Sequence, residues 1–141
     1  AGMAAPESAA GGGIWNIMLS HLRARIVEAL EQSPSVMLAT SGPAGLQLST
    51  CAAWHDDLRL VLLVPQQSDH LVNLETEAAA VVTGPGWRAT GIGQVRPTPA
   101  AALNLEASEL AWKAVVELQL VRFEFVEADG ATVYETIDID D

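Results

Sequence analysis

The longest alternating segment of the sequence, residues 113–127, changes the face of its apolar side chains halfway along. Its apolar positions form two sets of opposite parity: Val116, Leu118 and Leu120, followed by Val121, Phe123 and Phe125. Because successive side chains of a strand point to opposite faces, this change near Leu120-Val121 predicts a β-bulge or a strand that changes the face it buries. Closure of a β-barrel requires such a strand, so the segment favours a barrel.

The rest of the chain consists of short strand patterns separated by turn residues. Apolar residues at helical spacing predict one amphipathic helix over residues 14–32, which ends at Ser33-Pro34. Gly91 and Gly93 predict a bulge or a close backbone approach. Period-two segments lie at residues 36–40, 46–54, 58–64, 78–83, 87–95 and 132–138, with helical segments at 68–74 and 100–110. Six or seven antiparallel strands with few helices predict a closed barrel or a sandwich.

The length of 141 residues predicts a single domain, which we expect to occupy residues 14–141. Residues 1–13 are expected to form a disordered tail, in which Ala1-Gly2 before Met3 is typical of an expression-vector remnant. The sequence has neither a signal segment nor a membrane-spanning run, so the cytoplasm is the expected compartment. Cys51 is the only cysteine, which excludes an intrachain disulfide and a cysteine-cluster metal site.

The charge of the chain excludes two classes of partner. Seven basic residues against eighteen acidic ones give a net charge of −11, and Lys113 is the only lysine. Nucleic acids and anionic membranes are bound through cationic patches, which this sequence lacks. We therefore expect neither a nucleic acid nor a membrane as partner. The sequence also contains no metal-binding motif, so we expect no metal site.

The turn that follows the apolar strand 58–64 is the main candidate for a binding site. It reads Ser68-Asp69-His70 and leads into a short helix. Backbone N–H groups at the start of a helix favour an anionic group. His70 has two open interpretations: it binds a phosphate or iron, or it is a local capping and packing residue.

The order of these segments resembles the pyridoxamine-5′-phosphate-oxidase-like, FMN-binding split β-barrel family. The positions that carry the resemblance are Leu38-Ala39-Thr40, Leu48-Ser49-Thr50, residues 60–63, Ser68 with Asn73-Leu74, and Gly91-Ile92-Gly93-Gln94-Val95. The resemblance implies a six- or seven-stranded antiparallel split barrel with flanking helices. It also implies a homodimer that binds FMN at the subunit interface, and a flavin-dependent oxidoreductase activity.

The resemblance assigns roles to six residues. Ser68 and the backbone donors beside it would meet the flavin phosphate, and His70 and Arg88 would supply positive charge. Ser49 and Thr50 would contact polar ring or ribityl atoms. The sixth residue, Trp87, would cover a flat face of the ligand, although core packing is the alternative for its indole. No catalytic residue is identified.

The sequence also departs from the family pattern. Where the oxidases have basic residues at both ends of the second strand and a Ser-Arg-Lys turn, this chain has about Leu48, Ala53 and Ser68-Asp69-His70. The last of these is similar to a haem-utilisation-like branch of the same barrel, but the chain has no histidine after His70. The alternatives to FMN are therefore a non-enzymatic barrel that binds haem or another flat ligand, and a cofactor-free dimer.

Overall fold

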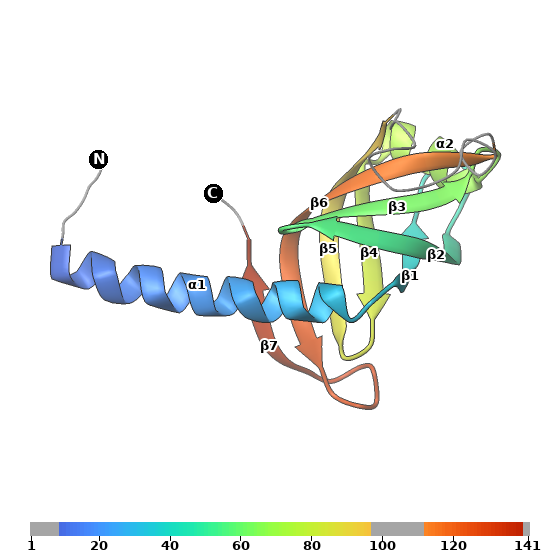
Figure 1. Cartoon of the computed structure of the whole chain (residues 1–141). Coiled ribbons are helices and arrows are strands. Elements are labelled where there is room, and N and C mark those ends of the chain that lie inside the picture. The colour runs from blue at the N-terminus through green and yellow to red at the C-terminus, as the bar shows by residue number, and fades with distance from the viewer. Residues whose placement is uncertain (1–8, 97–111, 140–141) are drawn as a thin grey trace.

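Six antiparallel strands close into a barrel, and a seventh strand extends from its edge (Figure 1). The structure, a computed structural model, describes residues 9–96 and 112–139, with side chains from residue 20 onward. Its elements are α1 (Ala9–Glu31), β1 (Ser35–Thr40), β2 (Gln47–Asp56), β3 (Arg59–Pro65), α2 (Asp69–Thr76), β4 (Ala79–Gly84), β5 (Trp87–Arg96), β6 (Lys113–Val126) and β7 (Val133–Asp138). The strand order is β3-β2-β1-β4-β5-β6-β7, and β3 also pairs with β6. The expected fold class is confirmed.

Strand β6 contains the bulge that its parity change predicts. Thr90 of β5 pairs with Arg122, but the next residue, Gly91, pairs with Leu120, so Val121 has no partner in this ladder. A Cβ atom on Gly91 would lie 2.7 Å from the carbonyl oxygen of Gln119, which only a glycine avoids. The bulge bends β6, which pairs with β5 along most of its length, with β3 at its N-terminal end and with β7 at its C-terminal end.

The barrel interior holds the hydrophobic core. The fully buried side chains include Leu38, Leu62, Val82, Leu118 and Phe123, which come from four different strands. Each alternates with a more exposed neighbour, as strands with one face in the core require. The two helices lie at opposite ends of β1, because α1 leads into its first residue and α2 contacts its last.

Helix α1 is longer than the sequence pattern predicts. It begins at Ala9, five residues before the expected start at residue 14. The Arg25 guanidinium lies 2.7 Å from a Glu135 carboxylate oxygen and 4.5 Å from the ring centre of Phe125, which fixes this half of the helix to β6 and β7. Residues 1–8 and the expected helical segment 100–110 lie outside the described residues. Neither described helix is long and apolar enough to cross a membrane.

Candidate functional site

The turn that leads into α2 is built around the cap of that helix. Ser68 has extended backbone angles, and its Oγ accepts a hydrogen bond from the His70 backbone N–H at 3.1 Å. Serine is favoured at this position because its hydroxyl satisfies a donor that the first helical turn leaves free. Asp69, the first residue of the helix, suits the positive end of the helix dipole. The turn therefore has a complete structural explanation.

The His70 side chain connects α2 to two strands of the barrel. It is 3% exposed, its Nδ1 lies 2.7 Å from Thr40 Oγ1 on β1, and its Nε2 lies 2.7 Å from Ser49 Oγ on β2. Both ring nitrogens are therefore engaged inside the chain. Of the two interpretations that the sequence left open for His70, these contacts favour the packing residue.

Asn73, one turn further along α2, holds the loop between β1 and β2. Its side chain is fully buried; Oδ1 accepts from the Ala44 N–H at 2.9 Å and Nδ2 donates to the Gly45 carbonyl at 2.8 Å. Nδ2 also donates to Thr40 Oγ1 at 3.2 Å. A Cβ atom on Gly42 would lie 2.9 Å from Oδ1, so the loop fits closely on this side chain. The sequence marked Asn73 as a family position, but nothing in the local pattern indicated this role.

The hydrogen-bond pattern indicates which nitrogen of His70 carries the proton. Thr40 Oγ1 accepts from Asn73, and His70 Nδ1 is the acceptor that the described residues offer for the Thr40 hydroxyl proton. Nδ1 is then an acceptor, and Nε2–H donates to Ser49. Burial lowers the pKa of His70 below its ordinary value, a shift that the nearby Asp69 carboxylate partly opposes. A neutral His70 supplies no positive charge to a phosphate.

The other three predicted site residues lie away from this group. Trp87 is 1% exposed, its Nε1 donates to Ser33 Oγ at 2.9 Å, and its ring stacks on Phe123 with centroids 5.2 Å apart. Arg88 is on the outer face of β5, where its Nε donates to the Glu124 carboxylate. Thr50 is also on the outer face, on β2, where it pairs across from Met37. Only Ser49, Ser68 and His70 are brought together.

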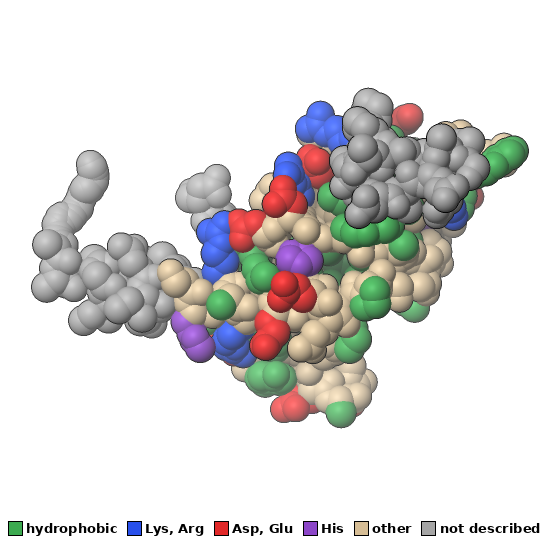
Figure 2. Space-filling model, viewed as in Figure 1, with side chains coloured by type: hydrophobic (Ala, Val, Ile, Leu, Met, Phe, Trp, Pro, Cys, Tyr) green, Lys and Arg blue, Asp and Glu red, His purple; other side chains and the backbone are tan. Residues whose placement is uncertain are grey.

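Carboxylates neutralise the arginines throughout the described chain. The ion pairs are Arg23–Asp57, Arg25–Glu135, Arg59 with Asp56 and Glu117, Arg88–Glu124, Arg96–Glu117 and Arg122–Asp138. Blue and red side chains accordingly lie next to one another in Figure 2. Lys113 has no ion pair within residues 9–96 and 112–139, and it lies exposed at the end of the β3–β6 ladder, opposite Pro65.

These observations test the turn before α2 as a phosphate site. Binding a phosphate there would require charge-assisted donors to offset its loss of hydration. The turn instead contains the Asp69 carboxylate and a neutral, fully engaged His70. The residues present therefore do not fit a flavin phosphate at this turn.

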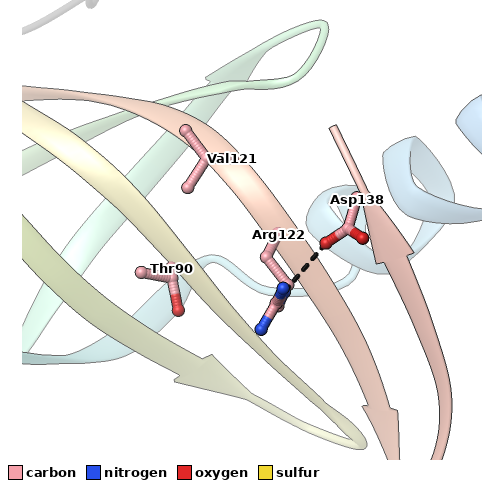
Figure 3. Close-up of a pocket in the computed structure, with 4 residues that line it drawn as sticks. All are labelled: Thr90, Val121, Arg122 and Asp138. Atoms are coloured by element: carbon pink, nitrogen blue, oxygen red, sulfur yellow. Dashed lines mark hydrogen bonds and ion pairs between the residues drawn. The ribbon is translucent and has the colours of Figure 1, made fainter. Parts of the chain in front are cut away.

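The outer face of the barrel carries two cavities that meet at Thr90. One has a volume of about 380 Å³, and its lining is mostly apolar: Ala39, Thr40, Ser41, Leu46, Glu77, Ala79, Ala80, Val81 and Thr90. The other, of about 420 Å³, is lined by Thr90, Val121, Arg122 and Asp138 (Figure 3). We refer to the two cavities together as the outer groove. The β-bulge forms part of it, because Val121 is the residue without a partner on β5.

Arg122 lies between Asp138 and Thr90 in this groove (Figure 3). Its Nε donates to Asp138 Oδ1 at 2.9 Å, and its two Nη atoms make no hydrogen bond to the described residues. The carboxylates of Asp138 and Glu124 raise the pKa of Arg122 above its ordinary value, so the guanidinium stays charged. No local sequence pattern predicts this arrangement, because residues 90, 122 and 138 meet only through the strand register.

Comparison with known proteins supports the architecture. No protein-family model matches the chain, and no curated protein matches it by sequence. Solved structures do match. General Stress Protein 26 from Bacillus anthracis gives a TM-score of 0.65 at 12% identity, over 84% of this chain and 99% of that one. The chain has the split-barrel fold of these proteins.

Two further structures extend this comparison. A Clostridium acetobutylicum protein related to general stress protein 26, described as of the pyridoxinephosphate oxidase family, gives a TM-score of 0.64 at 13% identity, over 84% of this chain and 95% of that one. An F420 reductase gives 0.56 at 17% identity, over 68% of this chain and 93% of that one. These likenesses agree with the family resemblance of the strand pattern and concern the fold.

Proposed function

We propose that this protein is a homodimeric split-barrel protein that binds a flat conjugated ligand in the outer groove, at the interface between two subunits. A flavin is the first candidate for the ligand. The observation that carries the proposal is the outer groove itself, which adjoins an uncovered apolar face of the barrel. Its cavities of about 380 and 420 Å³ are in the size range of cofactor sites.

The apolar face supports the dimer. Leu48, Met37 and Ile92 point outward and are 63%, 41% and 44% exposed. Ala39 pairs with Leu48 on one side and with Val81 on the other, and Ile92 pairs with Ala79, which lies on the same strand as Val81. Contiguous exposed apolar surface marks an interaction site, and a second copy of the same face covers it in a two-fold dimer.

The lining of the groove supports a flat, largely apolar body as ligand. Ala39, Val81 and Leu46 supply apolar walls, and Thr90 supplies a hydroxyl at the centre. In this proposal Thr50, on the same outer face, contacts polar atoms at the edge of the ligand. A bound flavin would supply redox chemistry, whereas the residues of this chain bind and orient it. We assign no catalytic residue.

A flavin-dependent oxidoreductase activity is the finer form of the proposal. The likeness to an F420 reductase and to a protein of the pyridoxinephosphate oxidase family supports it. A haem-binding barrel is the alternative, but ligation of iron through either ring nitrogen of His70 would break the bond of that nitrogen to Thr40 or to Ser49. In this proposal haem binds without His70.

Ligand binding is tested with four candidate ligands. The purified protein is incubated with FMN, riboflavin, F420 or haem, and binding is measured by thermal shift and by retention after desalting. We expect at least one flavin or deazaflavin to bind. If none of the four ligands binds or stabilises the protein, the binding function is contradicted.

The dimer is tested by light scattering after gel filtration. Met37→Glu places a charge in the proposed interface and should give monomers. Val72→Glu is the matched control, because Val72 lies on α2 and is 45% exposed, close to the 41% of Met37. A wild-type monomer, or equal dissociation of the two variants, contradicts the proposed interface.

A further inference from the structure

We infer that the outer groove recognises an anionic group of its ligand through Arg122, and that the turn before α2 has no part in this recognition. The inference rests on the proposed function and specifies the ligand further: a flat conjugated body that carries a phosphate or carboxylate arm. Arg122, Thr90 and the bulged Val121 form the part of the groove that receives the arm.

The hydrogen-bonding groups of the turn before α2 already have partners, whereas those of Arg122 are partly free. At the α2 end, the ring nitrogens of His70 and the amide of Asn73 already have partners within the chain. An anion would have to displace these buried bonds next to the Asp69 carboxylate. At Arg122, the two Nη atoms are uncommitted within the described residues, and the side chain is 54% exposed.

The Arg122 guanidinium also has the geometry to bind an anion. A guanidinium offers paired N–H donors that match two oxygens of a phosphate or carboxylate. Asp138 takes only the Nε position, so the remaining side of the fork is open to an anion. Arg88, which also lies in the β5–β6 ladder, is less exposed at 37% and does not line either cavity.

The groove joins an apolar part to a charged part. The two cavities meet at Thr90, one with a mostly apolar lining and the other with Arg122 in its wall. A ligand that spans both places its apolar body against Val81 and Ala39 and its anionic arm against Arg122. Thr90 lies at the junction and can donate to a polar atom between the two.

Asp138 allows the inference to predict an increase in affinity as well as a decrease. Its carboxylate holds Nε but also repels an incoming anion, so its removal should strengthen binding of a charged ligand and leave an uncharged one unaffected. This is the opposite of what loss of a merely structural ion pair would do.

FMN and riboflavin test the inference, because they differ only in the phosphate. Their dissociation constants are measured by flavin fluorescence for the wild type and for Arg122→Gln. We expect the wild type to prefer FMN by about tenfold or more, as one charge-assisted contact provides. Arg122→Gln should reduce this preference to about one, and Asp138→Asn should increase it without changing riboflavin binding.

Three variants serve as controls. Arg59→Gln removes an arginine that is also exposed and paired with carboxylates but lies outside the outer groove. Ser68→Ala and Lys113→Gln remove the polar groups near the start of α2. All three should keep the wild-type preference for FMN. Unchanged thermal stability of the unliganded Arg122→Gln protein shows that this variant is folded.

The inference is overturned if FMN and riboflavin bind the wild type equally, or if Ser68→Ala or Lys113→Gln abolishes the preference and Arg122→Gln keeps it. Where haem binds in place of flavins, haem and its dimethyl ester form the matched pair, with the same expected and contrary results. If neither the flavins nor haem binds, the proposed function itself fails, and the inference fails with it.

Discussion

The two polar regions of the barrel, the α2 end and the outer groove, differ in what their hydrogen-bonding groups contact. At the α2 end, His70 and Asn73 make all their side-chain bonds to the chain itself. In the outer groove, the Arg122 Nη atoms and the Thr90 hydroxyl make none to the described residues. Saturated buried groups stabilise one conformation, whereas open groups beside a cavity are available to a ligand.

The segment that resembles a cofactor site in the sequence is therefore not the region that we propose binds the ligand. The segment that most resembles a cofactor site in the sequence, Ser68 to Leu74, closes one end of the barrel in the structure. The region with binding potential lies instead where a bulge in β6 opens a cavity against β5 and β7. Substitutions at the α2 end should therefore change mainly stability, and substitutions in the groove mainly binding.

Asn73→Ala should have the largest effect on stability. It removes three hydrogen bonds and leaves the Ala44 N–H and the Gly45 carbonyl without their partner. We expect a loss of about 3 kcal/mol in the free energy of unfolding, measured by urea denaturation. Val72→Ala, at an exposed neighbouring position, should change it by less than about 0.5 kcal/mol. A loss below about 1 kcal/mol for Asn73→Ala would contradict the role of Asn73 in holding the loop between β1 and β2.

The second prediction concerns pH. Because the pKa of His70 is lowered in the folded state, the unfolded chain takes up a proton first as pH falls below about 6.5. Stability should be complete above that pH and decline below it until the folded pKa is reached, with a slope of at most about 1.4 kcal/mol per pH unit from this group. Denaturation midpoints across this range measure the slope.

A paired substitution assigns this slope to His70. His70→Gln should remove the His70 part of the decline, whereas His21→Gln, at an exposed position in α1, should leave it in place. If His70→Gln has the same pH dependence as the wild type, the buried neutral histidine is not its source.

Ser49→Ala tests the outer bond of the same group with a smaller effect. It leaves the His70 Nε2–H without its acceptor, and we expect a loss of about 1 kcal/mol in unfolding free energy. The matched control is Thr50→Ala, the next residue, whose side chain makes no hydrogen bond to the described residues and is exposed. Equal losses in the two variants would show that Ser49 has no special role.

The sequence predicted those features that depend on local pattern. The parity change near Leu120-Val121 predicted the bulge, and Gly91 marked the close approach opposite it. The turn at Ser68 and the short helix after it were also confirmed, because a serine cap and a change of period are local signals. The strand count followed from the alternating segments.

The features that were not predicted depend on register between distant segments. His70 contacts residues 30 and 21 positions away, and no local pattern shows which hydroxyls β1 and β2 will present to it. The same holds for Trp87, whose core position follows from its contacts with Ser33 and Phe123. It also holds for Arg122, which reaches Asp138 through the β6–β7 ladder.

Thr90→Val should give the smallest change in stability. It tests whether a substitution in the outer groove changes ligand binding and leaves the free energy of unfolding almost unchanged. Valine keeps the shape and strand preference of threonine, so the free energy of unfolding should change by less than about 0.5 kcal/mol. The loss of one neutral hydroxyl at the junction of the two cavities should weaken ligand binding by about three- to tenfold, measured by flavin titration.

Thr83→Val is the matched control for this prediction. Thr83 lies on the same outer face, one strand away on β4, but it lines neither cavity. Its substitution should leave flavin binding unchanged. If Thr83→Val and Thr90→Val weaken binding equally, the effect belongs to the face as a whole, and the junction at Thr90 does not define the site. If only Thr90→Val does, the ligand crosses the junction between the apolar wall and Arg122.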